Sequence, residues 1–498
     1  MTSSSSSSPS SPSSRSDELA TLDATAQAEL VRRREISPAE LVEAAIARAE
    51  RLQPVLNCFT TTRFDRARAE AEATGPDDGP FAGVPTAMKD LTLQIAGEQC
   101  HSGSRVVRAL DILGTTNSHH YDRFRSAGLV SLGRTNTPEF GNTITTEPLS
   151  YGPARNPWNT AHSTGGSSGG AAAAVAAGII PVAHATDGGG SIRIPASECG
   201  LVGLKPTRGR ISHGPTAAEG WAGSTAGHVV TRSVRDCAAL LDACHGYEPG
   251  DHYTAPPPSR PYLHELGADP GPLRIGFFAG PTLDGHVVHP ECVAAVDDAA
   301  KLLESLGHRV EAERPDAMME QSYGDNFVVI LAAGTANDVA LIEKTLGRPV
   351  GPDDIEPENL FFNELGKGVS GAQYLAAVES LHAYERRMAL WWTDPARGGR
   401  GFDVLITPTI AQPPPPIGWM YAPDARPGLR VRMLLQYTSQ FNGTGQPAVS
   451  LPLHMTADGL PVGVQFVGQF GREDLLLRLA SQIESAAPWA SRRPPVHA

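Results

Sequence analysis

The chain has 498 residues, with 54 acidic and 41 basic side chains and a formal net charge of −13 at pH 7. Proteins that bind nucleic acid without sequence preference need a basic face to neutralise phosphates, so we expect no nucleic-acid partner. The length allows one large domain or two to three ordinary ones, and therefore a sizeable buried core. The six cysteines include no CxxC pair, and we expect no metal site.

The first 16 residues, MTSSSSSSPSSPSSRS, carry too little apolar area to offset chain entropy, and we predict that they are disordered. They lack the apolar stretch of a secretory signal. The longest apolar run, 171–183, is interrupted by Gly178 and Pro181 and is too short to cross a bilayer. We therefore expect a soluble, cytoplasmic protein with no membrane partner.

The first well-marked element is a helix in the segment ISPAELVEAAIARAERL. Ser37 is a suitable N-cap, Pro38 suits the first helical position, and Glu40 completes a capping box. Leu41 and Ala45 begin an apolar stripe that continues at the helical spacing. The pattern predicts an amphipathic helix that packs on a core.

Helices and strands alternate farther along the chain. Short strands are predicted within 81–91 and 127–137, then an alanine-rich helix that ends near 178, and a strand at 182–186. The segments LRIGFF and GHRVEAE flank a helix, and FDVLITPT and LPVGVQFVG are typical of buried strands before a final helix from about Glu473. Residues 249–272 are rich in Pro and Gly and predict an irregular connection. This alternation favours an α/β fold with helices over a sheet.

The stretch TGGSSGG contains Ser167 in a G-x-S-x-G pattern, which is the nucleophile elbow of α/β-hydrolases. An elbow requires a strand directly before it, whereas residues 156–164 are rich in turn residues. A phosphate-binding P-loop is also disfavoured, because the lysine of that motif is missing. Taken alone, Ser167 is equally suited to cap the alanine-rich helix.

A second glycine loop, Gly188-Gly189-Gly190-Ser191, follows a predicted strand. Three glycines allow the backbone to approach a ligand with several amide N–H groups turned the same way, as in an oxyanion hole. Ser191 is therefore a candidate nucleophile, with the alternative that it only begins the next element.

A serine nucleophile needs a base, and no histidine has an obvious claim to that role. Lys89 ends the apolar segment VPTAM, so a core strand would carry its amine into a site of low dielectric. Burial would lower its pKa enough for the neutral amine to act as a base near pH 7. Ser167 would then lie between Lys89 and Ser191 and pass a proton from one to the other.

Three separated motifs, MKD, GGSSGG and TDGGGSIR, resemble the amidase signature family in residue type and spacing. The resemblance implies an α/β fold in a single domain over 17–492, with Ser191 as acyl-enzyme nucleophile, Ser167 on a cis peptide as relay, and Lys89 as base. It also implies that backbone amides of Gly188, Gly189 and Gly190 hold the oxyanion.

By the same resemblance, Asp187 and Arg193 support the glycine loop. The residues of the motifs are similar to those of the 6-aminohexanoate cyclic dimer hydrolase branch of the family. That likeness suggests Asn142 as a substrate-binding residue, although a loop cap fits it equally well. The implied reaction is hydrolysis of a small to medium neutral carboxamide, including cyclic or linear oligoamides, without a cofactor or metal. An amidotransferase A-type subunit or an acyl-transferring synthase remains an alternative, and a homodimer stays open.

Overall fold

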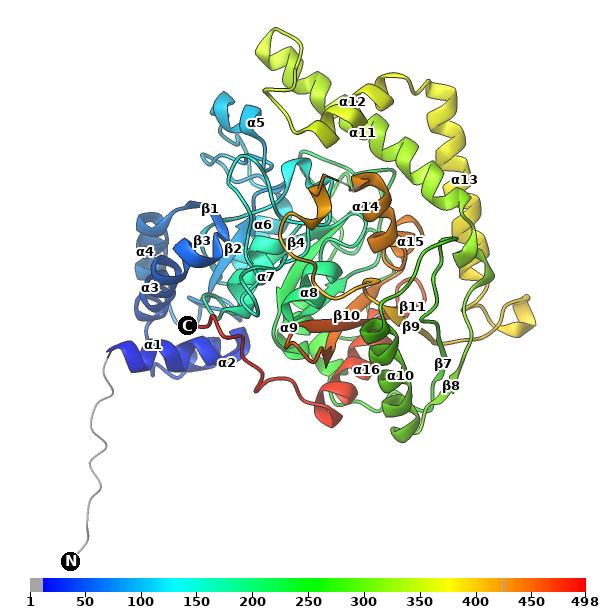
Figure 1. Cartoon of the computed structure of the whole chain (residues 1–498). Coiled ribbons are helices and arrows are strands. Elements are labelled where there is room, and N and C mark those ends of the chain that lie inside the picture. The colour runs from blue at the N-terminus through cyan, green and yellow to red at the C-terminus, as the bar shows by residue number, and fades with distance from the viewer. Residues whose placement is uncertain (1–11, 424–425) are drawn as a thin grey trace, which may run out of the picture.

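Two β-sheets form the centre of the computed structural model, which describes residues 12–423 and 426–498 (Figure 1). Three strands make the smaller sheet, and eight make the larger one. The strands are β1 (Phe59–Thr62), β2 (Pro85–Lys89), β3 (Val130–Thr135), β4 (Val182–Asp187), β5 (Val202–Lys205), β6 (Ala226–Thr231), β7 (Arg274–Phe277), β8 (Arg309–Glu311), β9 (Val404–Pro408), β10 (Ala448–Met455) and β11 (Pro461–Gly468).

Both sheets mix parallel and antiparallel pairs. The smaller sheet has the order β1-β3-β2, with β2 parallel to β3. The larger sheet has the order β4-β6-β5-β10-β11-β9-β7-β8, in which β7 is parallel to β8 and β9. At the junction of the sheets, the Thr86 hydroxyl donates to the Val182 carbonyl of β4. The carboxyl ends of β2 and β4 therefore lie close together.

Helices surround the two sheets (Figure 1). They are α1 (Pro12–Thr21), α2 (Ala24–Arg32), α3 (Pro38–Leu56), α4 (Phe64–Ala73), α5 (Arg105–Leu110), α6 (His119–Ser126), α7 (Gly169–Ala176), α8 (Arg193–Cys199), α9 (Val234–Cys244), α10 (Pro290–Ser305), α11 (Ser322–Leu346), α12 (Pro357–Lys367), α13 (Gly371–Ala389), α14 (Pro427–Leu435), α15 (Ser439–Gly443) and α16 (Glu473–Ala486). Helices α3 and α4 lie beside the smaller sheet, and α11, α12 and α13 form a separate group at the top of the view. The predicted α/β class is confirmed.

Local sequence signals account for several of these elements. The capping box between Ser37 and Glu40 is formed at the start of α3, with Pro38 in the first turn. The predicted strands around Lys89 and Arg134 are β2 and β3, and the alanine-rich helix is α7, whose residues are all buried. The predicted connection at 249–272 contains a single turn of 3-10 helix, Tyr262–Glu265. Each of these segments carries a strong local pattern and needs no distant partner to define it.

The prediction of disorder for residues 1–16 differs from the structure at residues 12–16. Helix α1 begins at Pro12, inside the segment 1–16 for which disorder is predicted, while residues 1–11 lie outside the described part of the chain. The Ser16 carbonyl accepts a hydrogen bond from the buried Arg48, and its hydroxyl donates to Ala44 on α3. These tertiary contacts order the end of a segment whose composition alone favours disorder.

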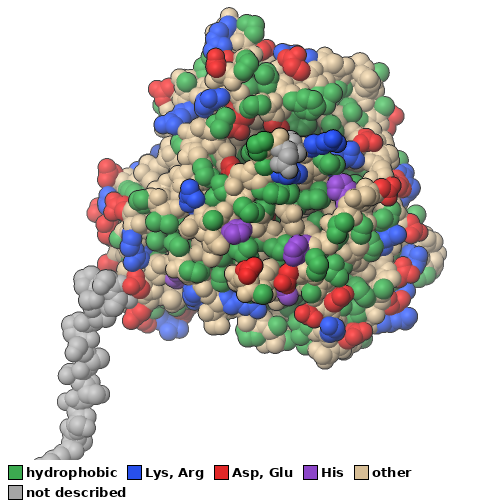
Figure 2. Space-filling view, viewed as in Figure 1, with side chains coloured by type: hydrophobic (Ala, Val, Ile, Leu, Met, Phe, Trp, Pro, Cys, Tyr) green, Lys and Arg blue, Asp and Glu red, His purple; other side chains and the backbone are tan. Residues whose placement is uncertain are grey.

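Helix α11 is the one element in the described ranges whose length and composition would allow it to cross a membrane. Here it packs against α12 and α13, and 33% of its most apolar stretch is buried. Acidic and basic side chains are interspersed with apolar ones over the molecular face in Figure 2.

Candidate active site

Lys89 ends β2, a strand whose five residues are all buried. Its Nζ donates to Ser167 Oγ at 2.7 Å and to Thr186 Oγ1 at 2.9 Å. Burial removes hydration from the ammonium and lowers its pKa to about 7, although the Asp187 carboxylate opposes the shift. At that pKa a large fraction of Lys89 is neutral at pH 7, and a neutral amine can accept a proton.

Ser167 lies just before α7, and the Gly166–Ser167 peptide is cis, as the family resemblance implies. The neighbouring Ser168 hydroxyl donates to the Thr186 carbonyl and accepts from the Thr186 N–H, which ties this loop to β4. Thr186 therefore forms hydrogen bonds both to Lys89 and to the loop that carries Ser167 and Ser168. Sequence reasoning did not identify Thr186, although its place at the end of β4 beside the second glycine loop was visible.

The second glycine loop joins β4 to α8 and carries Ser191. Gly190 has a φ of +146°, and a Cβ atom there would lie 2.5 Å from the Thr438 hydroxyl. A Cβ on Gly188 would lie 2.6 Å from the Trp221 ring. Both positions therefore require glycine, and Gly188 lines the same cavity as Ser191.

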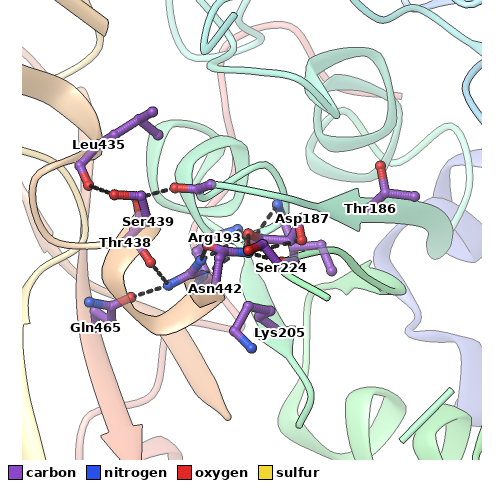
Figure 3. Close-up of polar contacts among 12 residues, drawn as sticks. Thr186, Asp187, Arg193, Lys205, Ser224, Leu435, Thr438, Ser439, Asn442 and Gln465 are labelled. Carbon is purple, nitrogen blue, oxygen red and sulfur yellow. Dashed lines mark hydrogen bonds and ion pairs between the residues drawn. The ribbon is translucent and has the colours of Figure 1, made fainter. Parts of the chain in front are cut away.

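Asp187 and Arg193 are both fully buried and form an ion pair at 2.8 Å across the glycine loop (Figure 3). The Asp187 carboxylate also accepts the N–H groups of Ile192 and Arg193, so it closes the loop on itself. Arg193 and Asn442 together hold the pKa of Asp187 well below its usual range. The ion pair and these hydrogen bonds lie at the two ends of the glycine loop, and a supporting role for Asp187 and Arg193 stays a prediction.

The C-terminal part of the chain completes this network. Asn442 donates to the Asp187 carboxylate and carbonyl and accepts from Arg193, whose Nη1 also reaches the Thr438 carbonyl and Gln465 Oε1 (Figure 3). Asn442 begins the segment NGTGQPAVSLPL, and nothing in that local sequence connects it to residue 187. Lys205 lies nearby, and burial lowers its pKa to about 7.

A cavity of about 550 Å³ opens onto the serines. Ser167, Thr186, Gly188 and Ser191 all line it. The rest of the lining mixes polar side chains with apolar ones, and the apolar ones include Leu91, Val107, Phe140, Trp221, Leu341 and Ile342. No hydrogen bond joins Ser167 to Ser191 in the described structure, and contacts of this kind commonly tighten only when substrate binds.

Three histidines also line the cavity, and each is held neutral near pH 7. Burial lowers the pKa of His120 and of His184 well below its ordinary value, and it lowers the pKa of His213 as well. The Lys89 N–H donates to His184 Nδ1, so this ring supports β2. Residues 12–423 and 426–498 contain no group of three or more His, Cys, Asp or Glu side chains placed to hold a metal ion.

The structure places Asn142 beside the cavity wall. Its neighbour Gly141 lines the cavity, whereas the Asn142 amide nitrogen donates to Thr335 Oγ1 at 3.0 Å on α11 and to Asn359 Oδ1 at 2.8 Å on α12. Asn142 thus links its loop to the α11 and α12 helices, and a contact with substrate stays a prediction.

Comparison with known proteins gives concordant results over nearly the whole chain. A family model described as Amidase matches residues 40–477. The chain is 43% identical over 482 residues to a 6-aminohexanoate-cyclic-dimer hydrolase of Paenarthrobacter ureafaciens, covering 95% of this chain and 96% of that protein. The solved structure of a 6-aminohexanoate cyclic dimer hydrolase complexed with substrate matches with a TM-score of 0.90, 42% identity, and coverage of 96% and 99%.

The A-type component of a glutamyl-tRNA(Gln) amidotransferase from Thermotoga maritima matches with a TM-score of 0.76 and 26% identity, over 96% of this chain and 99% of that one. The fold and these relatives together define a hydrolase that cleaves carbon–nitrogen bonds of small amides. The chain belongs to the amidase family.

Proposed function

We propose that Ser191 forms the acyl-enzyme, with Ser167 as proton relay and Lys89 as base. Neutral Lys89 accepts the Ser167 proton while Ser167 accepts the proton of Ser191, whose oxygen attacks the amide carbonyl carbon. The observation that carries this proposal is the 2.7 Å contact between Lys89 Nζ and Ser167 Oγ, behind a cavity that Ser191 also lines. The lowered pKa of Lys89 supports it.

The main-chain amides of the loop from Gly188 to Ser191 stabilise the tetrahedral oxyanion. Each donor of this kind contributes roughly 3 to 4 kcal/mol to transition-state stabilisation. The relay then returns its proton to the departing nitrogen as the carbon–nitrogen bond breaks. Water attacks the resulting ester by the same route, and Ser191 is regenerated when the free acid leaves.

The substrate class we propose is a small to medium, largely neutral carboxamide, including cyclic or linear oligoamides. The apolar part of the lining and the volume of the cavity support it, because both suit the hydrocarbon part of a ligand of drug-like size. The names of the relatives that share 42–43% of their residues with this chain point to the cyclic dimer of 6-aminohexanoate.

The assignment of the serines is tested with a fluorophosphonate probe. Mass spectrometry of the labelled protein should locate the adduct on Ser191, and labelling on Ser167 would reverse the two roles. A Lys89→Ala variant should fold and lose amide turnover, and normal turnover in that variant would remove the relay. Release of free acid from simple amides by the purified chain distinguishes hydrolysis from acyl transfer.

An amidotransferase A-type role is the second candidate, favoured only by the 26% identical structural relative. Co-purification with partner subunits would support it, and activity of the isolated chain on simple amides would not. We further propose one domain over 17–492 in the cytoplasm, and a homodimer is one alternative for its oligomeric state. Size-exclusion chromatography with light scattering tests that state.

A further inference from the structure

Helix α11 forms part of the cavity wall with one of its faces. Gly334, Asn337, Asp338, Leu341 and Ile342 all line the cavity, at spacings of three and four residues. Positions with this spacing share one side of an α-helix. Asp338 thus lies on the same face as the apolar residues that follow it, at a part of the cavity wall that is exposed to solvent.

Asp338 is a carboxylate for which the described residues provide no partner. No hydrogen bond or ion pair joins it to any residue of 12–423 or 426–498. The surrounding protein reduces its hydration and raises its pKa to about 6, so most of it remains ionised at pH 7. Glu219, the other carboxylate of the cavity, differs because it is hydrogen-bonded to Tyr253.

The cavity offers Asp338 no compensating positive charge. No lysine or arginine belongs to the described cavity lining, and the three histidines there are neutral. A carboxylate in the cavity lining that has no counter-ion there favours a charged hydrogen-bond donor, because such contacts are about twice as strong as neutral ones. The same charge disfavours a ligand that carries a carboxylate.

We propose that Asp338 forms an ammonium subsite of this active site, which takes amide substrates bearing a primary ammonium group on an alkyl chain. The subsite rests on the proposed function, since Ser191 opens into the same cavity. The apolar side chains that share the cavity suit the methylene chain, and the carboxylate accepts hydrogen bonds from its charged end. Neutral amides of the same length bind the walls but leave Asp338 unpaired.

Two pairs of substrates test the subsite. The first compares 6-aminohexanamide with hexanamide, which differ by an ammonium group on the acyl side. The second compares N-(5-aminopentyl)acetamide with N-pentylacetamide, which differ on the side of the leaving amine. In at least one pair the wild-type enzyme should show a higher kcat/KM for the ammonium substrate, and Asp338→Asn should lower that ratio about tenfold.

Glu219→Gln is the matched control, because it removes the other negative charge of the same cavity. Its ratio should stay within twofold of wild type. An equal fall of the kcat/KM ratio in both variants would show a general effect of negative charge and overturn the subsite. A kcat/KM ratio of one for both substrate pairs with the wild-type enzyme would also overturn it.

A binding measurement separates this inference from the catalytic proposal. In a Ser191→Ala background, hexylammonium should bind at least tenfold more tightly than hexanol by calorimetry, and Asp338→Asn should remove the difference. If both alcohol and amine bind equally, the subsite is wrong whatever the enzyme hydrolyses. If the ammonium preference is present but no amide is cleaved by wild type, the proposed function fails instead.

Discussion

Replacing Lys89 by methionine should abolish turnover and stabilise the folded protein. Burial lowers the pKa of Lys89 from its ordinary value of 10.5 to about 7. At about 1.36 kcal/mol per pKa unit, the folded state at pH 7 loses about 4 kcal/mol of protonation free energy relative to the unfolded chain. The variant also loses two hydrogen bonds of about 1 kcal/mol each. A net gain of about 2 kcal/mol in the free energy of unfolding is expected.

The pH dependence of this gain isolates the charge effect from the hydrogen bonds. Because the folded-state pKa lies below the unfolded value, the unfolded chain binds more protons between pH 7 and 10.5. Wild-type stability therefore rises with pH across this window relative to the variant. The two proteins should differ by about 2 kcal/mol less at pH 9 than at pH 7.

Urea unfolding followed by tryptophan fluorescence measures both quantities. Lys344→Met, at an exposed position of α11, is the control, and its difference from wild type should not change between pH 7 and 9. A Lys89→Met variant whose stability difference is constant across these pH values would refute a lowered lysine pKa. Retained amide hydrolysis in that variant would refute its role as base.

Three further results are expected. The kcat/KM for a neutral amide should rise about tenfold per pH unit below pH 7 and level off above it. The Asp338→Asn variant should give the same profile, and a flat profile from pH 5 to 8 would contradict a lysine base. Arg193→Ala should lower the free energy of unfolding by about 3 to 5 kcal/mol, because it leaves the Asp187 carboxylate buried without its ion-pair partner. Urea unfolding at pH 7 measures this loss, and a loss below 1 kcal/mol would show that the ion pair is dispensable for stability. Gly190→Ala should reduce kcat by about 100-fold or more, because its positive φ and the Thr438 contact force the oxyanion loop to move, and wild-type initial rates would exclude a role for that loop.

Much of the fold could be predicted from local patterns. The capping box of α3 and the buried strands around Lys89 and Val182 are confirmed because each is defined by residues within one segment. The group of α11, α12 and α13 was not predicted. Helix α11 is apolar around much of its surface, so the periodicity that marks an amphipathic helix is weak there.

The candidate site shows the same division. Lys89, Ser167 and Ser191 could be selected from the sequence because glycines and an apolar strand surround them. In the structure both serines line one cavity, and Lys89 contacts Ser167. Asn442 and Asp338 could not be, since their importance arises only from tertiary placement. Asn442 contacts Asp187 across 255 residues of sequence, and an isolated aspartate on a helix is usually a solvated surface group.

The order of the larger sheet bears on how the enzyme emerges from the ribosome. Strands β10 and β11, the last two in the chain, occupy the middle of that sheet. Asn442 and Gln465 form hydrogen bonds with Asp187 and Arg193, which flank the loop that carries Ser191. A nascent chain that already contains every proposed reacting group still lacks β10 and β11, the strands that join β4-β6-β5 to β9-β7-β8 in the larger sheet. We therefore expect catalytic competence only when synthesis is almost complete, and chains that end before β10 should be inactive toward amides.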